Sequence, residues 1–242
     1  MEKGPLFERA ANPKQYDLPD LEWSQEAGLE SPSRSFFWQQ FLPHSKEWKD
    51  ASLLDIGAGT GWLVQEVKKY GAKKAVGIEP SERNLQLAHE HFPDAELVNA
   101  SLETFESEEK YDGMFSVMSF PHIADLPSAF DRIALHLKEK GRLYLLVPDY
   151  DYFKRPRHDY SISTEELSPD EFVVAVQRPS GTLADIVRKN EAYIEAAKKA
   201  GLSLESQKAV PPTEELMERQ PKYRAFEGVP LVQFLVFKKE PS

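Results

Sequence analysis

Three glycines at alternate positions form the feature of this chain best suited to chemistry, because they directly follow an apolar segment. Residues 53–62 read LLDIGAGTGW, which places Gly57, Gly59 and Gly61 after the apolar run and Asp55 near its end. Glycine has no side chain, so the backbone at these positions can pass close to a ligand. Asp55 can accept a hydrogen bond or attract a cation. Together they indicate a binding loop for a ligand with a positive charge.

The position of the third glycine narrows the class of ligand. A phosphate-binding loop of the dehydrogenase kind needs a glycine one place after Gly61, where this chain has Trp62. The loop therefore favours a ligand without phosphates at this point, and a sulfonium amino acid fits that description. The alternative is a tight turn that binds nothing. It is disfavoured because turns after strands are usual ligand positions in parallel sheets.

An acidic residue, Glu79, ends the next apolar segment and lies 22 positions after Gly57. In an open parallel sheet, a carboxylate at the tip of the strand beside a glycine loop can accept both hydroxyls of a ribose. Taken alone, Glu79 is equally a solvated loop acid or a charge at a helix N-terminus. Combined with the glycine loop, it predicts a ribose-binding side chain.

The segments around these residues must position them, and their periodicity predicts alternating strands and helices. We expect strands at 52–56, 75–78, 96–99, 113–119 and 142–147. Helices are expected at 62–70, at 81–91 after a Ser81 cap, and at 125–138 with Gly141 closing it. This alternation is typical of an α/β fold with a parallel sheet between two layers of helices.

The flanking segments depart from this alternation. Residues 1–50, rich in aromatics, are expected to form an N-terminal cap segment with a short helix at 33–42. Residues 51–242 are expected to form the main domain, with an insertion at about 148–181 that carries a strand at 172–177. A helix at 182–200, strands at 202–210 and 231–238 that pair antiparallel, and a polar loop between these strands complete the expected elements.

The order and spacing of these motifs resemble the class I S-adenosylmethionine-dependent methyltransferases, particularly the group that acts on small molecules. The resemblance covers residues 51–147 well. It implies a three-layer, Rossmann-like fold with a mostly parallel seven-stranded sheet and an antiparallel last strand. It also implies that Glu79 holds the ribose of S-adenosyl-L-methionine and that the loop lines its methionine part through Asp55, Gly57, Ala58, Gly59 and Gly61.

Two further stretches carry implied contacts. The family often has an acidic residue for the adenine after the third strand, and here Ser101 and Leu102 are expected to replace it, with Asn99 as the alternative. After the fourth strand, Met118, Ser119 and His122 are expected to line the transfer site.

His122 is the candidate general base if the acceptor is a hydroxyl or a protonated nitrogen, because an unperturbed histidine pKa is near 6.5. A structural role is the alternative for a lone histidine. The Asn/Asp-Pro-Pro-aromatic motif of enzymes that methylate adenine or glutamine is absent, which disfavours those acceptors.

Side chains outside the sheet pattern are candidates for acceptor contact. Aromatic and basic residues of the cap and the insertion are the candidates: Tyr16, Phe37, Trp38, Tyr152, Lys154, Arg155 and Arg157. The basic residues suit a carboxylate or phosphate on the acceptor. The alternative is that the aromatics pack a small core and the basic residues are solvated.

Composition limits the partners. The chain has 242 residues, 40 acidic against 30 basic side chains, and a net charge of −10, which disfavours nucleic acid and anionic membranes as partners unless a local basic patch overrides the average. The expected partner is the small-molecule acceptor that the resemblance implies. It has no cysteine, no apolar run that approaches a membrane span and no histidine–carboxylate spacing typical of a metal site. We expect a cytoplasmic protein, and the sequence does not indicate its oligomeric state.

Two other functions stay open: a non-catalytic S-adenosylmethionine-binding regulator, and an NAD-dependent oxidoreductase, which Trp62 disfavours.

Overall fold

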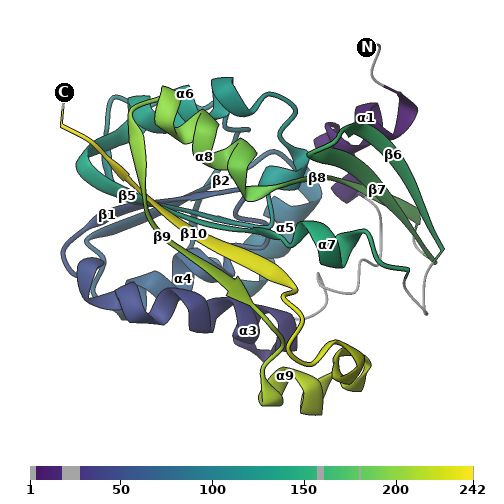
Figure 1. Ribbon diagram of the computed structural model, residues 1–242. Coiled ribbons are helices and arrows are strands. Elements are labelled where there is room, and N and C mark those ends of the chain that lie inside the picture. Colours follow the sequence, from purple (N-terminus) through teal and green to yellow (C-terminus); the bar gives the residue numbers. More distant parts are fainter. Residues whose placement is uncertain (1–3, 18–27, 157–160, 180, 242) are drawn as a thin grey trace.

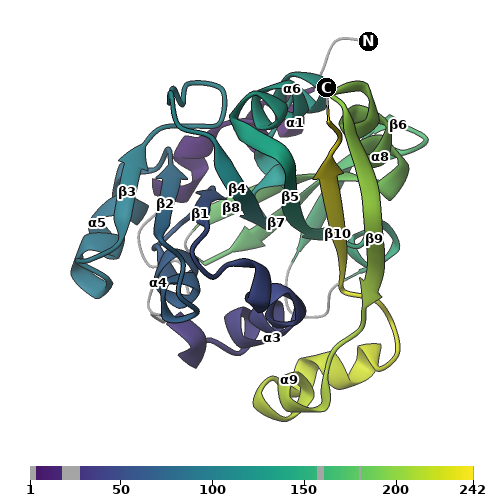
Figure 2. The ribbon, with the colours of Figure 1, turned by 90° about the vertical axis from the view of Figure 1, so that its left-hand side faces the viewer.

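The computed structural model describes residues 4–17, 28–156, 161–179 and 181–241, and it is built around a seven-stranded sheet (Figure 1). Figure 2 shows the strands in the order β3-β2-β1-β4-β5-β10-β9. The strands of this sheet are β1 Ser52–Ile56, β2 Lys74–Glu79, β3 Glu96–Asn99, β4 Tyr111–Val117, β5 Leu137–Pro148, β9 Leu202–Val210 and β10 Val232–Lys239. The helices are α1 Pro5–Ala10, α3 Pro32–Phe41, α4 Trp62–Lys69, α5 Glu82–His91, α6 Leu126–His136, α7 Tyr150–Phe153, α8 Asn190–Lys199 and α9 Glu214–Arg219.

The first five strands are parallel, since β2 pairs with β1 and β3, and β4 pairs with β1 and β5. Every residue of β1 is buried, as expected for a central parallel strand covered on both faces. Strand β10 runs antiparallel to both β5 and β9. The predicted three-layer, Rossmann-like fold with an antiparallel last strand is therefore confirmed.

Two apolar cores cover the two faces of the sheet. Phe130 and Ile133 of α6 and Tyr193 of α8 pack on one face. Phe41 of α3 and Val64 of α4 pack on the other. These helices lie above and below the sheet in Figure 1. Because parallel strands end at the same edge, the loops after β1, β2, β3 and β4 meet there.

A second sheet of three antiparallel strands begins in the predicted insertion and continues beyond it (Figure 1, right). Its strands are β6 Ile162–Ser168, β7 Glu171–Arg178 and β8 Gly181–Arg188. One of its faces packs against α1 of the cap through Phe7 and Ala10. The other face packs toward Phe153, Tyr152 and Met118. The sheet thus connects the N-terminal segment to the edge where the loops meet.

The prediction of a helix at 182–200 was wrong over its first part. Residues 181–188 form β8, and α8 begins only at Asn190. Arg178 pairs with Gly181, so β7 and β8 form a tight hairpin whose loop contains Pro179. Side chains of β8 are buried on both faces, which masks the alternation that identifies a strand. The second sheet therefore extends beyond the expected end of the insertion.

Two smaller predictions also differ from the structure. Gly141 does not close α6, which ends at His136; Gly141 lies inside β5, because Leu137 already pairs with Tyr111 of β4. The expected polar loop after β9 contains α9, in which the Thr213 side chain caps the Leu216 amide at 3.2 Å and Leu216 is buried.

Candidate functional site

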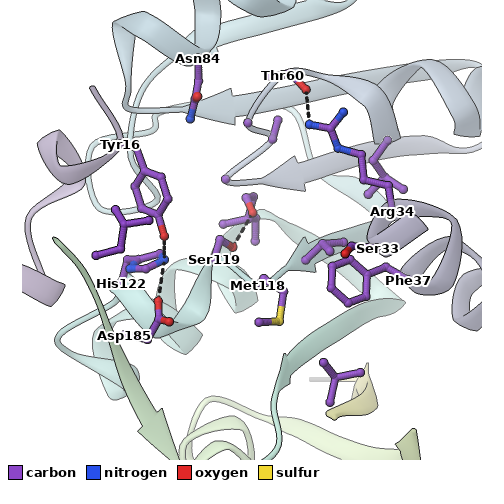
Figure 3. A pocket seen from close by; sticks show the side chains of 18 of the residues that line it. Tyr16, Ser33, Arg34, Phe37, Thr60, Asn84, Met118, Ser119, His122 and Asp185 are labelled. Carbon is purple, nitrogen blue, oxygen red and sulfur yellow. Dashed lines mark hydrogen bonds and ion pairs between the residues drawn. The ribbon is translucent and has the colours of Figure 1, made fainter. Parts of the chain in front are cut away.

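A cavity of about 680 Å³ lies at the edge where the loops after β1, β2, β3 and β4 meet. Figure 3 shows part of its lining, with side chains from the cap, the glycine loop and the second sheet. Nine of the ten residues predicted for cofactor binding or catalysis line it, and Gly61 does not; the nine are Asp55, Gly57, Ala58, Gly59, Glu79, Ser101, Leu102, Met118 and His122.

The glycine loop keeps a backbone conformation that favours glycine. Gly57, Gly59 and Gly61 have φ angles of 72°, 55° and 79°, in the left-handed region. A Cβ at Gly57 would lie 2.4 Å from the Ser119 Cβ, so the loop after β1 packs against the turn after β4. A Cβ at Gly59 would meet no protein atom within 4 Å. Gly61 is the N-cap of α4, and a Cβ there would lie 3.2 Å from Leu97 Cδ1.

The Glu79 carboxylate is buried between the loop and the start of α5. Its Oε2 accepts a hydrogen bond from the Gly59 amide at 2.8 Å, and its Oε1 accepts from the Ser81 amide at 2.9 Å and from Asn84 Nδ2 at 3.2 Å. Burial raises the pKa of Glu79, and the hydrogen bonds from Ser81, Gly59 and Asn84 oppose that shift. The side chain therefore holds the loop and also lines the cavity.

The Asp55 carboxyl is 5% exposed and lies at the carboxyl end of β1. No hydrogen-bond donor meets its side chain within the described part of the chain. Burial, and then the charge of Glu79, raise the pKa of Asp55 to about 8. Such a carboxyl favours a cationic partner, because a nearby positive charge would stabilise its ionised form.

The stretch after β3 lines the cavity through Ala100, Ser101, Leu102 and Glu103. The Ser101 hydroxyl lies 3.3 Å from the Thr104 hydroxyl. Asn99, the alternative for the adenine contact, does not line the cavity. Of the residues predicted for the adenine, Ser101 and Leu102 thus lie at the cavity and Asn99 lies outside its lining.

Met118 and Ser119 form the turn after β4. Met118 has a φ of 58°, an unusual value for a residue with a side chain, and its amide donates to the Leu146 carbonyl at 2.9 Å. The Ser119 hydroxyl donates to the Ile56 carbonyl at 2.7 Å. Strained residues gather at functional sites, so the conformation of Met118 supports its predicted place in the site wall.

His122 is part of a polar cluster at one side of the cavity (Figure 3). Its Nε2 hydrogen-bonds the Tyr16 hydroxyl and lies 3.6 Å from Asp185 Oδ1, while its Nδ1 lies 3.2 Å from Gln15 Nε2. Burial lowers the pKa of His122, whereas Asp185 and a backbone hydrogen bond to Ala10 oppose that shift. The imidazole is therefore neutral near pH 7 and able to accept a proton.

Arg34 of α3 is a site residue that the sequence did not reveal. It is 8% exposed, lines the cavity, and donates from Nη2 to the Thr60 hydroxyl of the glycine loop at 3.1 Å. A buried guanidinium at this position suits a carboxylate. Asp185 and Gln15 were also missed, because their places depend on β8 and on the fold of the cap.

The predicted acceptor contacts divide into two groups. Tyr16, Phe37 and Tyr152 line the cavity, whereas Trp38 and Arg155 do not. Trp38 packs against Trp48 and Trp62 in the core, which agrees with its alternative structural role.

The basic residues of the insertion lie elsewhere. Lys154 pairs with Glu166 at 3.2 Å and lies over the Tyr150 ring, outside the cavity lining. Arg157 lies outside the described residues. Within the described ranges, Arg34, Arg178 and Lys222 are the cations of the lining.

Two absences apply to the described part of the chain. No group of three or more histidine and acidic side chains there is placed to hold a metal ion. None of its helices has the length and apolar character needed to cross a bilayer.

Comparison with known proteins gives one family match and several partial relatives. A family model described as "Methyltransferase domain" matches residues 33–207. A tRNA U34 carboxymethyltransferase of Ruthia magnifica subsp. Calyptogena magnifica is 27% identical over 126 residues, which are 49% of this chain and 40% of that protein. A ubiquinone biosynthesis O-methyltransferase of Nitrobacter winogradskyi is 32% identical over 95 residues, 38% of this chain and 36% of that protein. The chain thus spans less than half the length of these relatives.

Solved structures share the fold over most of the chain. The PH0226 protein from Pyrococcus horikoshii OT3 aligns with a TM-score of 0.69 and 16% identity, covering 88% of this chain and 94% of that one. An S-adenosylmethionine dependent methyltransferase from Mesorhizobium loti aligns with a TM-score of 0.68 and 16% identity, covering 86% of this chain and all of that one (100%).

Proposed function

The chain belongs to the methyltransferase domain family, and from this premise we propose that it transfers the methyl group of S-adenosylmethionine to a small-molecule acceptor. The observation that carries the proposal is a single cavity that joins the glycine loop to a wall of aromatic and titratable side chains. One end has the features of a nucleoside site. The other end has the features of an acceptor site.

The residues of the loop end fit the cofactor. Glu79 would hold the ribose, and Ser101 with Leu102 would meet the adenine. Asp55 would meet the amino group, and Arg34 would meet the carboxylate. The open space at Gly59 supports this placement, because the backbone there leaves room for a ligand.

The acceptor end supports a small molecule. Residues from the cap, α7, the second sheet and the segment between β9 and β10 surround it, among them Phe37, Tyr152, Leu183 and Tyr223. Aromatic and apolar walls of this kind bind compact organic molecules and exclude water. The net charge of −10 also opposes attraction of a phosphate backbone.

The chemistry that the cofactor supplies when bound is an electrophilic methyl group. The protein then has to position the acceptor atom in line with that methyl group, keep water away and accept a proton where the acceptor carries one. The walls around Phe37 and Tyr152 serve the first two tasks.

A second candidate acceptor is tRNA, because several partial relatives carry the name tRNA U34 carboxymethyltransferase. Their similarity spans less than half of each protein. A test that separates the two acceptor classes is therefore part of the experiment.

The proposal is tested by calorimetry with S-adenosylhomocysteine, followed by transfer of radioactive methyl groups to small molecules and to total tRNA. We expect binding, loss of binding in Gly59→Arg, and transfer to a small molecule but not to tRNA. If the intact protein binds no S-adenosylhomocysteine, the proposed use of S-adenosylmethionine is refuted. Transfer to tRNA alone would show that the acceptor is tRNA and not a small molecule.

A further inference from the structure

Three titratable side chains from distant parts of the sequence meet at one side of the cavity (Figure 3). Tyr16 comes from the 3₁₀ helix Pro13–Asp17 of the cap, His122 from the 3₁₀ turn Phe120–His122 after β4, and Asp185 from β8. Tyr16 hydrogen-bonds His122 Nε2, and Asp185 Oδ1 lies 3.6 Å from the same nitrogen. All three line the cavity.

The cluster is held by contacts that the glycine loop does not share. Gln15 binds both polar backbone groups of Ala184, accepting from its amide at 2.9 Å and donating to its carbonyl at 3.2 Å. These two hydrogen bonds hold the cap beside Ala184 and its neighbour Asp185. Arg188 of β8 reaches the Phe120 carbonyl at 3.5 Å, which ties β8 to the turn that carries His122.

Burial lowers the pKa of His122, and the Asp185 carboxylate opposes that shift and so favours proton acceptance by the imidazole. Burial, Asp185 and Glu79 raise the pKa of the Tyr16 hydroxyl, whereas Arg178 lowers it, so Tyr16 carries its proton until it is passed on. The imidazole is neutral near pH 7 because burial lowers its pKa. Once protonated, it would be stabilised by the Asp185 carboxylate.

We infer that Tyr16, His122 and Asp185 form a proton relay and that the acceptor atom is a hydroxyl oxygen or an amine nitrogen that loses a proton during transfer. The inference rests on the proposed function. The acceptor donates its proton to the Tyr16 oxygen as the Tyr16 hydroxyl passes its own proton to His122 Nε2. The electron pair left on the acceptor atom forms the bond to the methyl carbon. The carbon–sulfur bond breaks, and its electron pair remains on sulfur.

Each member of the relay has a separate task. Tyr16 is the catalytic residue, because it contacts the acceptor. His122 receives the proton, and Asp185 is a positioning residue that stabilises the imidazolium. An acceptor that carries no proton at neutral pH, such as a carboxylate, would not need this cluster.

The experiment uses the full chain and the variants Tyr16→Phe, His122→Gln and Asp185→Asn. Their affinity for S-adenosylhomocysteine is measured first. Transfer is then measured as released S-adenosylhomocysteine with a panel of phenols, amines, carboxylic acids and thiols, over a range of pH. We expect transfer to a phenol or an amine, and a fall in kcat/KM of about 10²–10⁴-fold in His122→Gln with unchanged cofactor affinity.

Two readouts separate a relay from a structural role. The wild-type kcat/KM should fall as the pH drops below the ordinary histidine range, and His122→Gln should lose that dependence. A nitrophenol that is already ionised needs no base, so the deficit of Tyr16→Phe and His122→Gln should shrink with it. His89→Gln and Tyr70→Phe, at more exposed positions outside the cavity, are the matched controls.

The inference is overturned if the variants match the wild type, if their deficit is the same with the ionised phenol, or if no phenol or amine in the panel is methylated. A wild-type protein without affinity for S-adenosylhomocysteine would instead overturn the proposed function itself.

Discussion

Glu79 and Gly59 are joined directly: the carboxylate of the residue that ends β2 accepts a hydrogen bond from the loop amide at 2.8 Å. The same side chain accepts from Ser81 and Asn84 at the start of α5. It therefore fixes the glycine loop relative to the neighbouring strand and helix. A ligand that binds at the loop meets an arrangement that this carboxylate has already set.

Replacing Glu79 by Gln should weaken S-adenosylhomocysteine binding by about tenfold or more, because hydrogen bonds to charged groups contribute about 1.5–3 kcal/mol each. The amide of Gln has one acceptor oxygen, so its NH₂ group would face an N–H donor. Calorimetry measures the affinity, with Glu82→Gln on the exposed face of α5 as the control. Equal affinities of the two variants would contradict this role.

The loop glycines should respond differently to alanine. Gly59→Ala should cost only about 1 kcal/mol of stability, because its backbone is left-handed but its methyl group would meet no protein atom within 4 Å. The same methyl group would occupy space meant for the ligand, so the variant should bind S-adenosylhomocysteine more weakly. Gly57→Ala should cost at least about 2 kcal/mol, because strain adds to a Cβ contact of 2.4 Å with Ser119. Thermal unfolding and calorimetry report the two effects.

The double variant Gly57→Ala/Ser119→Gly is the control for that contact. Removing the Ser119 side chain should recover part of the lost stability, since the clash is between the two Cβ atoms. Additive losses would show that strain at position 57 acts alone.

Local patterns predicted the central sheet well. The apolar runs of β1 and β3 were expected at their observed bounds, and the resemblance to class I S-adenosylmethionine-dependent methyltransferases is confirmed by the family match and the fold. The cofactor S-adenosylmethionine follows with it. These features depend on residues close together in the sequence, which is why they could be read in advance.

The remaining features depend on contacts between distant residues. Strand β8 is defined by its pairing with β7, and its burial on both faces gave no alternating pattern. Asp185 reaches the site only through that strand, and Gln15 only through its bonds to Ala184. His122 was predicted from its place after β4, but its partners Tyr16 and Asp185 could not be derived from spacing.

Cofactor binding should depend on pH through Asp55, whose pKa is raised to about 8 by burial and by Glu79. A raised carboxyl pKa contributes stability that is full below 3.8 and is lost as the pH rises toward 8. A cationic amino group beside Asp55 would ionise it, so binding should release a proton. Affinity for S-adenosylhomocysteine should therefore rise between pH 6 and 8, by up to about tenfold per unit, and then level off.

Calorimetry in two buffers with different ionisation enthalpies counts the released protons. Asp55→Asn cannot ionise, so its affinity should be lower above pH 8 and independent of pH. A wild-type affinity that stays constant from pH 6 to 8 would contradict the predicted proton release.

The cap should detach from β8 when Gln15 is replaced by Leu. The Gln15 amide is buried and satisfies both the N–H and the C=O group of Ala184, so Leu would leave two polar groups without a protein partner. Each such buried group costs about 1–3 kcal/mol. We expect faster amide hydrogen exchange at Ala184 and faster proteolysis of residues 5–17, with Gln86→Leu on the exposed face of α5 as the control.

Because Gln15 also contacts His122, methyl transfer should fall in Gln15→Leu while S-adenosylhomocysteine binding is retained. Protection of Ala184 equal to that of the wild type would show that this amide does not hold the cap in place.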